Sequence, residues 1–294
     1  PGGGRSAACI SRITAISTAC FGAGAYCASP RPLSSICQAR ARTGIESPAA
    51  SARPRGRAAT GGLGPSGVPL HPGGPDGETA LRAARRLLAI AREVRRPVHV
   101  LHVTTAEEVG LLASHRDIAT FECTPQHLLL AAPECYARLG TLVQMNPPIR
   151  EARHRDALWG AVTSGALDAI ASDHAPHKRD EKARPYPQSP SGMTGVPATP
   201  ALLLDCVAQG RLSLERLVEL CCAGPARVWG APAKGRIAEG CDADLVLVDL
   251  DAERTIENRW IESRCGWTPF DGVRVRGWPV ATLVRGRVAM RDGE

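Results

Sequence analysis

Residues 98–123, VHVLHVTTAEEVGLLASHRDIATFEC, contain a complete strand–helix–strand pattern. The apolar run 98–103 predicts a strand, and Thr105 and Glu108 have the spacing of a capping box, which predicts that a helix begins after Thr105. The second apolar run, 118–123, predicts another strand. Strands that are apolar at nearly every position and alternate with helices are typical of a parallel sheet buried on both faces.

The same alternation extends to both sides of this stretch. Upstream, residues 78–96 have apolar side chains at helical spacing, and Pro97 ends that pattern. Downstream, the pattern predicts helices at 133–139 and 150–164. It predicts strands at 142–145 and 167–172. Four β/α units in roughly a hundred residues make half of a (β/α)8 barrel of the TIM type, or part of an open sheet.

The remaining sequence predicts a long loop, two helices and a small β region. Residues 173–195 are rich in proline and charge and too long for a passive connector, which favours a functional loop. Helices are predicted at 198–209 and 213–222. The later segments predict strands of a small β domain, part of a β-sandwich, at 234–250 and 273–290.

We expect an α/β chain in three parts: a leader over residues 1–70, a partial barrel over 71–232 and a partial β domain over 233–294. The leader is rich in Ala, Gly, Ser, Pro and Arg and has no sustained helical or strand periodicity. Such a composition fits a transit peptide, a disordered linker or a frame-shifted reading of GC-rich DNA. We favour the third interpretation, and because the sequence begins at Pro1 rather than Met we expect a fragment with a disordered or non-authentic leader.

The formal net charge of +7 comes entirely from the leader. Residues 1–70 hold eight arginines and one acidic residue, whereas residues 71–294 hold 28 basic and 28 acidic residues. A nucleic-acid-binding domain would carry its excess charge on a folded surface, so this distribution argues against that class. No run approaches the roughly 18 apolar residues of a membrane helix. The eleven cysteines have no CxxC spacing, which indicates reduced thiols of a cytoplasmic protein.

Polar side chains follow four predicted strands in succession. His102 ends the first strand, and residues 124–127, 146–148 and 173–177 follow the next three. A barrel active site is built at these carboxyl ends of the strands. His99 and His102 are an odd number of residues apart, so only one of them can face the site, and we expect that one to be His102.

Taken singly, each of these residues has an ordinary structural explanation, such as a hydrogen-bonded histidine or a loop cap. Together, His102 and Asp173 supply an imidazole and a carboxylate, which are ligand types of a catalytic metal such as zinc. A carboxylate that reaches both a metal and the attacking water can also act as a general base.

Several blocks between residues 71 and 294 resemble successive blocks of bacterial dihydroorotase, in the cyclic amidohydrolase superfamily. The most specific are SDHAPH (172–177) and GRIAEGCDADLVLVD (235–249), and the others include HVLHVTTAEE, ECTPQHLLL, QMNPPIR and PSGMTGV. The resemblance implies a zinc-dependent hydrolase of a cyclic amide. Its reaction would convert dihydroorotate reversibly to N-carbamoyl-aspartate, in pyrimidine biosynthesis.

The resemblance also implies roles for six residues. His102 would be the metal ligand of barrel strand five. Asp173 would be the metal ligand of strand eight and would also carry the proton from the nucleophile to the leaving nitrogen. The remaining four would bind substrate: His177 on its carboxylate, Ser191 and Gly192 on the pyrimidine ring through their backbone, and Asn146.

The sequence departs from the family pattern in its first part. The family's first strand supplies an HxH metal pair and a substrate-binding arginine, and later strands supply a carboxylated lysine or an aspartate and a further histidine. No histidine precedes His71 here, and no HxH occurs. Since catalytic zinc typically has about three protein ligands, we expect weak zinc binding and little dihydroorotase activity. His127 and His174 lie in matching blocks, and we expect structural or supporting roles for both.

Two alternatives stay open. One is a related amidohydrolase, such as a hydantoinase or an allantoinase; residues 146–148 and the PSGMTGV block favour dihydroorotase, but the missing arginine removes one discriminator. The other is a non-catalytic, dihydroorotase-like subunit that scaffolds an aspartate carbamoyltransferase. The expected partners are therefore a small-molecule substrate and, for the scaffold, a carbamoyltransferase or a second copy, with no nucleic acid and no membrane.

Overall fold

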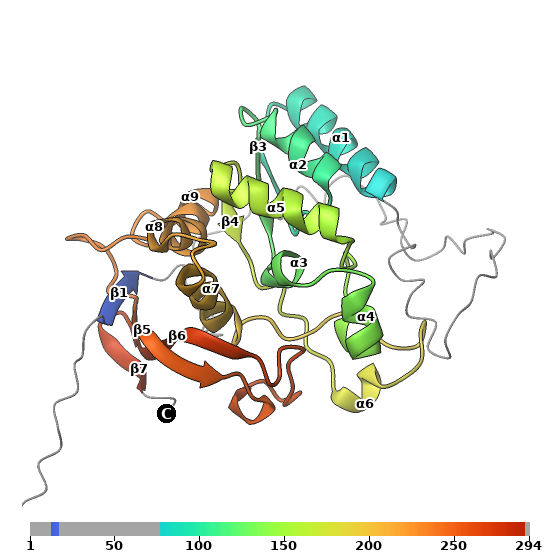
Figure 1. Ribbon diagram of the computed structural model, residues 1–294. Helices are drawn as coiled ribbons and strands as arrows, with labels where there is room; N and C mark the ends of the chain where they lie inside the picture. The colour runs from blue at the N-terminus through green and yellow to red at the C-terminus, as the bar shows by residue number, and fades with distance from the viewer. Residues whose placement is uncertain (1–12, 18–76, 292–294) are drawn as a thin grey trace, which may run out of the picture. The chain divides into compact units, whose positions relative to one another are not determined.

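A three-stranded parallel sheet carries the first part of the structure, a computed structural model that describes residues 13–17 and 77–291 (Figure 1). Its strands are β2 (Val98–Val100), β3 (Ala119–Cys123) and β4 (Ala169–Ile170), in the order β2-β3-β4. Their side chains alternate between two faces, as in any strand. On β3 the apolar Phe121 and Cys123 are fully buried on one face, whereas the polar Thr120 and Glu122 lie on the other.

Helices cover the apolar face of this sheet. These helices are α1 (Gly77–Glu93), α2 (Ala106–Ala113) and α5 (Ala152–Ser164), and α2 and α5 lie side by side in Figure 1. Leu112 of α2 and Leu158 of α5 pack with Phe121 in one buried cluster. Short helices follow the strands at α3 (Pro125–Leu129) and α4 (Glu134–Leu139).

The predicted capping box at the start of α2 is confirmed. The Thr105 hydroxyl accepts a hydrogen bond from the Glu108 amide at 3.1 Å, and the Glu108 carboxylate accepts one from the Thr105 amide at 3.1 Å. Both side chains are buried. The cap therefore fixes the path of the chain just after His102, the first of the expected site residues.

Three strand predictions were wrong in extent or kind. Residues 142–145 were expected to form a strand, but Gly140–Val143 is a 3-10 helix (η3), so the described residues contain three parallel strands here instead of four. A short apolar run does not distinguish a buried strand from another buried segment, and Val143 and Met145 are buried without pairing into the sheet. The first strand also ends at Val100 instead of residue 103, and the strand expected at 167–172 spans only Ala169–Ile170.

The chain then passes through the expected long loop into helices. The loop contains one turn of helix, α6 (Arg179–Lys182), and is followed by α7 (Thr199–Ala208). The predicted helix at 213–222 is longer and irregular, with an α-helical start, a π-helical turn and an α-helical end: α8 (Leu214–Val218), η4 (Glu219–Ala223) and α9 (Gly224–Val228).

The predicted β region forms one antiparallel sheet of four strands in the order β1-β5-β6-β7. Its strands are β1 (Ile13–Ser17), β5 (Leu245–Thr255), β6 (Arg274–Val284) and β7 (Arg287–Arg291), and a 3-10 helix, η5 (Asn258–Trp260), lies between β5 and β6. Helix α7 packs on β6, as Figure 1 shows. Gly277 allows this approach, because a Cβ there would lie 2.7 Å from the Leu204 Cβ.

Strand β1 corrects one expectation about the leader. Residues 1–70 were expected to have no regular structure, but residues 13–17 pair with β5 from Ile13 opposite Asp249 to Ser17 opposite Leu245. The rest of the leader lies outside the described residues. The second sheet of a sandwich is not found among the described strands, so the β-sandwich stays a prediction.

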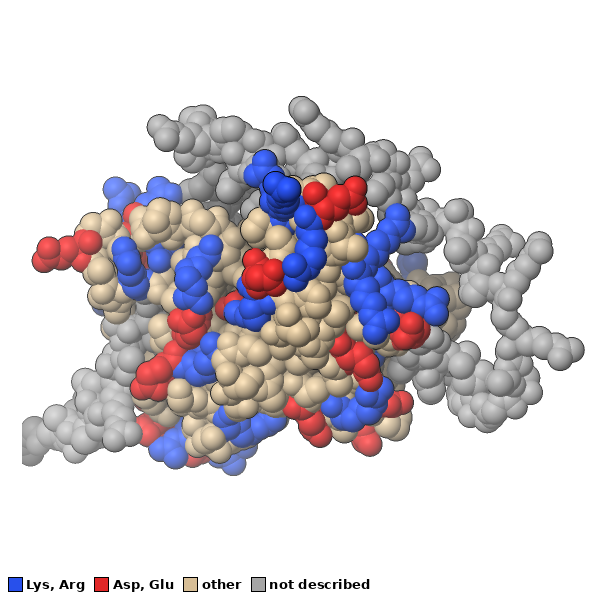
Figure 2. Space-filling model, turned by 90° about the horizontal axis from the view of Figure 1, so that it is seen from above, with Lys and Arg blue, Asp and Glu red and all other residues tan. Residues whose placement is uncertain are grey.

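Charged side chains of both signs are interspersed on the face of the molecule seen in Figure 2. No helix in the described ranges is long and apolar enough to cross a membrane. Cys123, Cys135 and Cys206 are buried free thiols, and burial raises the pKa of Cys135 and of Cys206 to about 11, which keeps both protonated at neutral pH.

Candidate functional site

The structure brings His102 and Asp173 to the same edge of the parallel sheet. His102 lies two residues beyond the end of β2, and Asp173 lies three residues beyond the end of β4. Both have a positive φ, 39° at His102 and 43° at Asp173, in a region that non-glycine residues rarely adopt. Such strain persists only where the surrounding structure imposes it, and it concentrates at functional sites.

Asp173 lies in a mixed electrostatic environment. Its side chain is half-buried, and this burial raises its pKa above the ordinary aspartate value. The neighbouring His102 opposes the rise and the carboxylate of Glu122 adds to it. His102 and Asp173 are therefore close enough to interact. A carboxylate with a raised pKa is a better proton acceptor than an ordinary aspartate.

His99 lies on β2, three residues before His102. It bonds to Thr120 Oγ1 at 2.8 Å and to Glu122 Oε2 at 3.0 Å, and the His99 and Glu122 side chains are both buried. His99 and His102 do not lie on one strand as expected, because β2 ends at Val100 and the chain has left the strand before His102. Glu122 thus bonds to His99 and, through its negative charge, raises the pKa of Asp173.

His127 is a buried histidine in α3 that ties two segments together. Its Nδ1 lies 2.7 Å from the Thr124 hydroxyl and its Nε2 lies 3.1 Å from the Pro147 carbonyl oxygen. Burial lowers the pKa of His127 to about 4, so the ring is neutral at pH 7. A neutral ring that donates from Nε2 to Pro147 and accepts at Nδ1 satisfies both contacts. This arrangement agrees with the structural role expected for His127.

His174 also acts as a backbone anchor. Its Nδ1 accepts hydrogen bonds from the amides of Gly195 and Val196, at 3.1 and 3.3 Å. Burial lowers the pKa of His174, which favours the neutral, accepting form. The Ala175 amide donates to the Met193 carbonyl at 3.0 Å. These bonds hold the 191–196 segment beside the chain that follows Asp173.

Gly192 is at a position that requires glycine. Its φ is 134°, and a Cβ there would lie 2.4 Å from the Ala175 carbonyl oxygen. Its amide donates to the Gln144 carbonyl at 2.9 Å. The backbone of Gly192 is therefore packed between two other segments of the chain, next to the anchor that His174 provides.

The structure brings three of the four expected substrate-binding residues into one network. His177 Nε2 lies 3.2 Å from the Ser191 carbonyl oxygen, and the Ser191 hydroxyl accepts from Gln144 Nε2 at 3.3 Å. Gln144 also accepts from Gly192, and Asn146 is exposed two residues beyond Gln144. The His177 ring uses Nε2 for Ser191, and its Nδ1, the atom that could meet a substrate carboxylate, lies 4.0 Å from Glu181 Oε2.

Two side chains in this region were missed by the sequence analysis. Gln144 is buried and donates to the Ser189 carbonyl at 2.8 Å. Lys182 has no exposed surface, and its Nζ donates to the carbonyl oxygens of Gln144 and Pro190, both at 2.8 Å. Lys182 lies in a highly charged run, 178–184, and such a run is normally solvated, so no sequence pattern indicated its burial.

The donor set of the described residues does not by itself fit a catalytic zinc. His102 and Asp173 offer one nitrogen and one carboxylate, of the right chemical types. Within residues 13–17 and 77–291, no group of three or more His, Cys, Asp or Glu side chains is placed to hold a metal ion. A catalytic zinc keeps about three protein ligands, so at least one donor is missing from this part of the chain.

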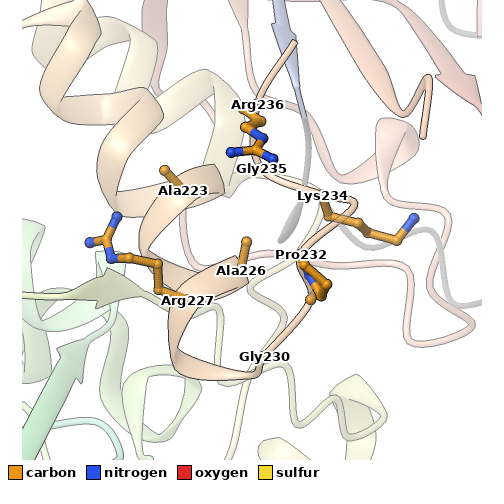
Figure 3. Close-up of a pocket in the computed structure, with 9 residues that line it drawn as sticks. Ala223, Ala226, Arg227, Gly230, Pro232, Lys234, Gly235 and Arg236 are labelled. Carbon is orange, nitrogen blue, oxygen red and sulfur yellow. The ribbon is translucent and has the colours of Figure 1, made fainter. Parts of the chain in front are cut away.

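A separate pocket lies beside α9 (Figure 3), and none of the six expected site residues lines it. Arg227, Lys234 and Arg236 are among its lining residues. Arg227 is paired with Glu219, and Lys234 is paired with Asp242 and Asp244. Acidic partners thus neutralise Arg227 and Lys234, whereas Arg236 donates through Nε to the sulfur of Cys241 at 3.4 Å.

Comparisons with known proteins agree on one family. Residues 63–289 match the amidohydrolase family. The chain is 43% identical over 220 residues to the dihydroorotase of Halobacterium salinarum, which covers 75% of the chain and 50% of that protein. It is 38% identical over 208 residues to the dihydroorotase of Methanothermobacter thermautotrophicus, with 71% and 47% covered. The chain thus spans about half the length of the curated relatives it matches.

Solved structures lead to the same family. The L-hydantoinase (dihydropyrimidinase) of Arthrobacter aurescens superimposes with a TM-score of 0.70 at 33% identity, covering 74% of this chain and 50% of that chain. The dihydropyrimidinase of Brevibacillus agri superimposes with a TM-score of 0.73 at 28% identity, covering 77% and 52%. The resemblance read from the motifs is therefore confirmed, and the chain belongs to the amidohydrolase family, a family of hydrolases, with a dihydroorotase-like C-terminal portion.

Proposed function

We propose that the described residues form the carboxyl-side half of a dihydroorotase site, which hydrolyses the cyclic amide of dihydroorotate to N-carbamoyl-aspartate. The observation that carries this proposal is the pairing of His102 and Asp173, both with positive φ, at the carboxyl edge of the parallel sheet. The identity to dihydroorotases supports the choice of substrate. In this proposal β2, β3 and β4 are strands six, seven and eight of a barrel, so His102 follows strand six instead of strand five.

Asp173 would carry the proton in this reaction. Its carboxylate takes a proton from the attacking water as the water oxygen bonds to the ring carbonyl carbon. When the ring C–N bond breaks, Asp173 returns the proton to the leaving nitrogen. Burial, which raises the pKa of Asp173, makes the carboxylate a stronger base for the first step. The imidazole of His102 is close enough to stabilise the charged form of Asp173 electrostatically.

The network around Gln144 would hold the substrate. His177 would face the substrate carboxylate through Nδ1, and the backbone at Ser191 and Gly192 would contact the ring. Asn146, exposed beside this network, would complete the set. A ring that bears a carboxylate would therefore bind better than an uncharged ring of the same size.

We also propose that these 294 residues by themselves bind zinc weakly and hydrolyse dihydroorotate slowly. The family would supply the remaining donors from strands that this sequence does not match, since it contains no HxH and no histidine before His71. The buried free thiols of Cys123, Cys135 and Cys206 support a reducing compartment such as the cytoplasm.

Ligand preference tests the substrate assignment without requiring turnover. Saturation-transfer NMR on the full chain would compare dihydroorotate, hydantoin and allantoin at equal concentration. We expect the largest transfer to dihydroorotate, and we expect His177→Gln to reduce it. His115→Gln is a matched control, because His115 precedes β3 and so lies at the opposite edge of the sheet. Equal transfer to dihydroorotate and hydantoin would contradict the assignment.

A hydantoinase is the second candidate, because the solved structures that superimpose on the chain include hydantoinases. The same NMR comparison decides between the two, since hydantoin lacks the carboxylate. The third candidate is a non-catalytic scaffold for aspartate carbamoyltransferase, and the one observation that supports it is the incomplete set of metal donors among the described residues. Co-elution of the chain with a purified aspartate carbamoyltransferase in size-exclusion chromatography would support the scaffold, and separate elution would exclude it.

A further inference from the structure

Lys182 is a buried ammonium group that the proposed chemistry does not use. It ends α6 and has no exposed surface, although lysine is among the residues least often buried. Its Nζ donates to the carbonyl oxygens of Gln144 and Pro190, each at 2.8 Å. No ion pair joins Lys182 to an acid within the described ranges, and its ammonium group instead donates to two backbone carbonyl oxygens.

The two carbonyls belong to the two segments that carry the expected substrate-binding residues. Gln144 lies two residues before Asn146, and Pro190 directly precedes Ser191 and Gly192. The backbone of Lys182 adds to the same junction, because its carbonyl oxygen accepts hydrogen bonds from the hydroxyl groups on both sides, those of Thr141 at 2.5 Å and Ser189 at 3.2 Å.

We infer that Lys182 is a positioning residue, whose side chain couples the segment of Asn146 to the segment of Ser191 and Gly192. The inference deepens the proposed function, on which the substrate-binding role of these segments rests. Without the ammonium group, the Gln144 carbonyl would retain the Gly192 amide as a partner, but Pro190 would lose the bond that joins it to Gln144. The two segments would then move more independently.

Burial gives this coupling a pH signature. It is the sole cause that lowers the pKa of Lys182, which falls to about 8. The charged or titratable neighbours along the chain are His177 and Lys178 before α6, Arg179, Asp180 and Glu181 on α6, and Arg184 and Tyr186 in the following loop. His177 also contacts the Ser191 carbonyl oxygen at 3.2 Å, while η3 and residues 144–146 contribute no charged or titratable group. Above the pKa the neutral amine retains two N–H groups, but its hydrogen bonds to the carbonyls are weaker than those of the ammonium.

Methionine methyl groups provide probes on both sides of this junction. The sequence has three methionines, Met145, Met193 and Met290. Met145 and Met193 are buried next to Gln144 and Gly192, whereas Met290 lies on β7 of the other sheet. The full chain labelled with [methyl-13C]methionine therefore gives two reporters of the junction and one internal control.

We expect the Met145 and Met193 resonances of the wild-type chain to shift together between pH 6.5 and 9.5, with a midpoint near 8, while Met290 stays constant. In Lys182→Leu the first two resonances should be displaced and lose this midpoint, with Met290 unchanged. Lys178→Leu, an exposed lysine on the same segment, should match the wild type.

The titration of the wild-type chain is sufficient to overturn the inference, even where Lys182→Leu does not fold. Constant Met145 and Met193 shifts across this pH range would contradict it, as would a Lys182→Leu spectrum identical to the wild type. Because no substrate is added, the result does not depend on the proposed function. A chain that shows the methyl titration but no preference for dihydroorotate would retain Lys182 as a coupling residue and reject the substrate.

Discussion

Replacement of Gly195 by alanine should disturb the chain at the point where the long loop passes Ser172. A Cβ at residue 195 would lie 2.1 Å from the Ser172 carbonyl oxygen and 3.0 Å from Gln126 Nε2. The Ser172 oxygen also accepts a hydrogen bond from Gln126 Nε2 at 2.9 Å, so it is held in place. Relief of the clash requires a backbone shift of about 1 Å, and overpacking of this kind costs about 1–3 kcal/mol.

The shift would reach the candidate site directly, because Ser172 precedes Asp173. Urea denaturation followed by circular dichroism would measure the effect, with a fall of about 2 kcal/mol expected in the free energy of unfolding of Gly195→Ala. Gly160→Ala is the matched control: residue 160 is exposed in α5, and a Cβ there meets nothing within 4 Å. It should gain about 0.5–1 kcal/mol from higher helix propensity. Equal stability of Gly195→Ala and the wild type would refute the packing described here.

Two further predictions concern buried ionisable groups. Burial holds the pKa of His127 at about 4, against about 6.5 in an unfolded chain. The unfolded chain therefore binds more protons between these values, so stability should fall by up to about 3 kcal/mol as the pH falls from 6.5 to 4. Urea denaturation at several pH values should show this loss of stability in the wild type and a smaller loss in His127→Gln. If the free energy of unfolding falls with pH equally steeply in the variant, His127 is not the cause. Asp168 directly precedes β4, and its carboxylate accepts hydrogen bonds from the Arg116 guanidinium at 2.5 and 2.7 Å and from the Phe121 amide at 2.9 Å. Asp168→Ala should lower the free energy of unfolding by about 2 kcal/mol, less than the loss of a fully buried ion pair, because Arg116 is partly exposed. A double-mutant cycle with Arg116→Met should show that the two losses are coupled. Additive losses would exclude the ion pair as the cause of the destabilisation.

The parts of the fold that depend on local chemistry could be predicted from the sequence. The capping box at Thr105 needs only residues three apart, and it was found as predicted. The strand predicted at 142–145 failed because burial of Val143 and Met145 comes from packing against distant segments, which gives the same apolar run as a strand. The pairing of β1 with β5 is also non-local, and nothing in residues 13–17 alone indicates it.

The candidate site shows the same division. His102 and Asp173 could be placed together because the carboxyl ends of parallel strands meet at one edge of a sheet. Their positive φ values could not be predicted, and neither could the bond between His99 and Glu122, because both depend on where the strands end. Lys182 was missed for a physical reason: a lysine among charged residues normally lies in solvent, and its burial follows from the loop closing over it.

Zinc binding to the full chain tests the central claim, a dihydroorotase-like half site with two metal donors. The measurement is the zinc content of the chain after equilibration with zinc and dialysis, compared with that of Asp173→Asn. We predict much less than one zinc per chain, a further decrease in Asp173→Asn, and little hydrolysis of dihydroorotate. One zinc retained per chain, together with measurable ring hydrolysis, would contradict the account.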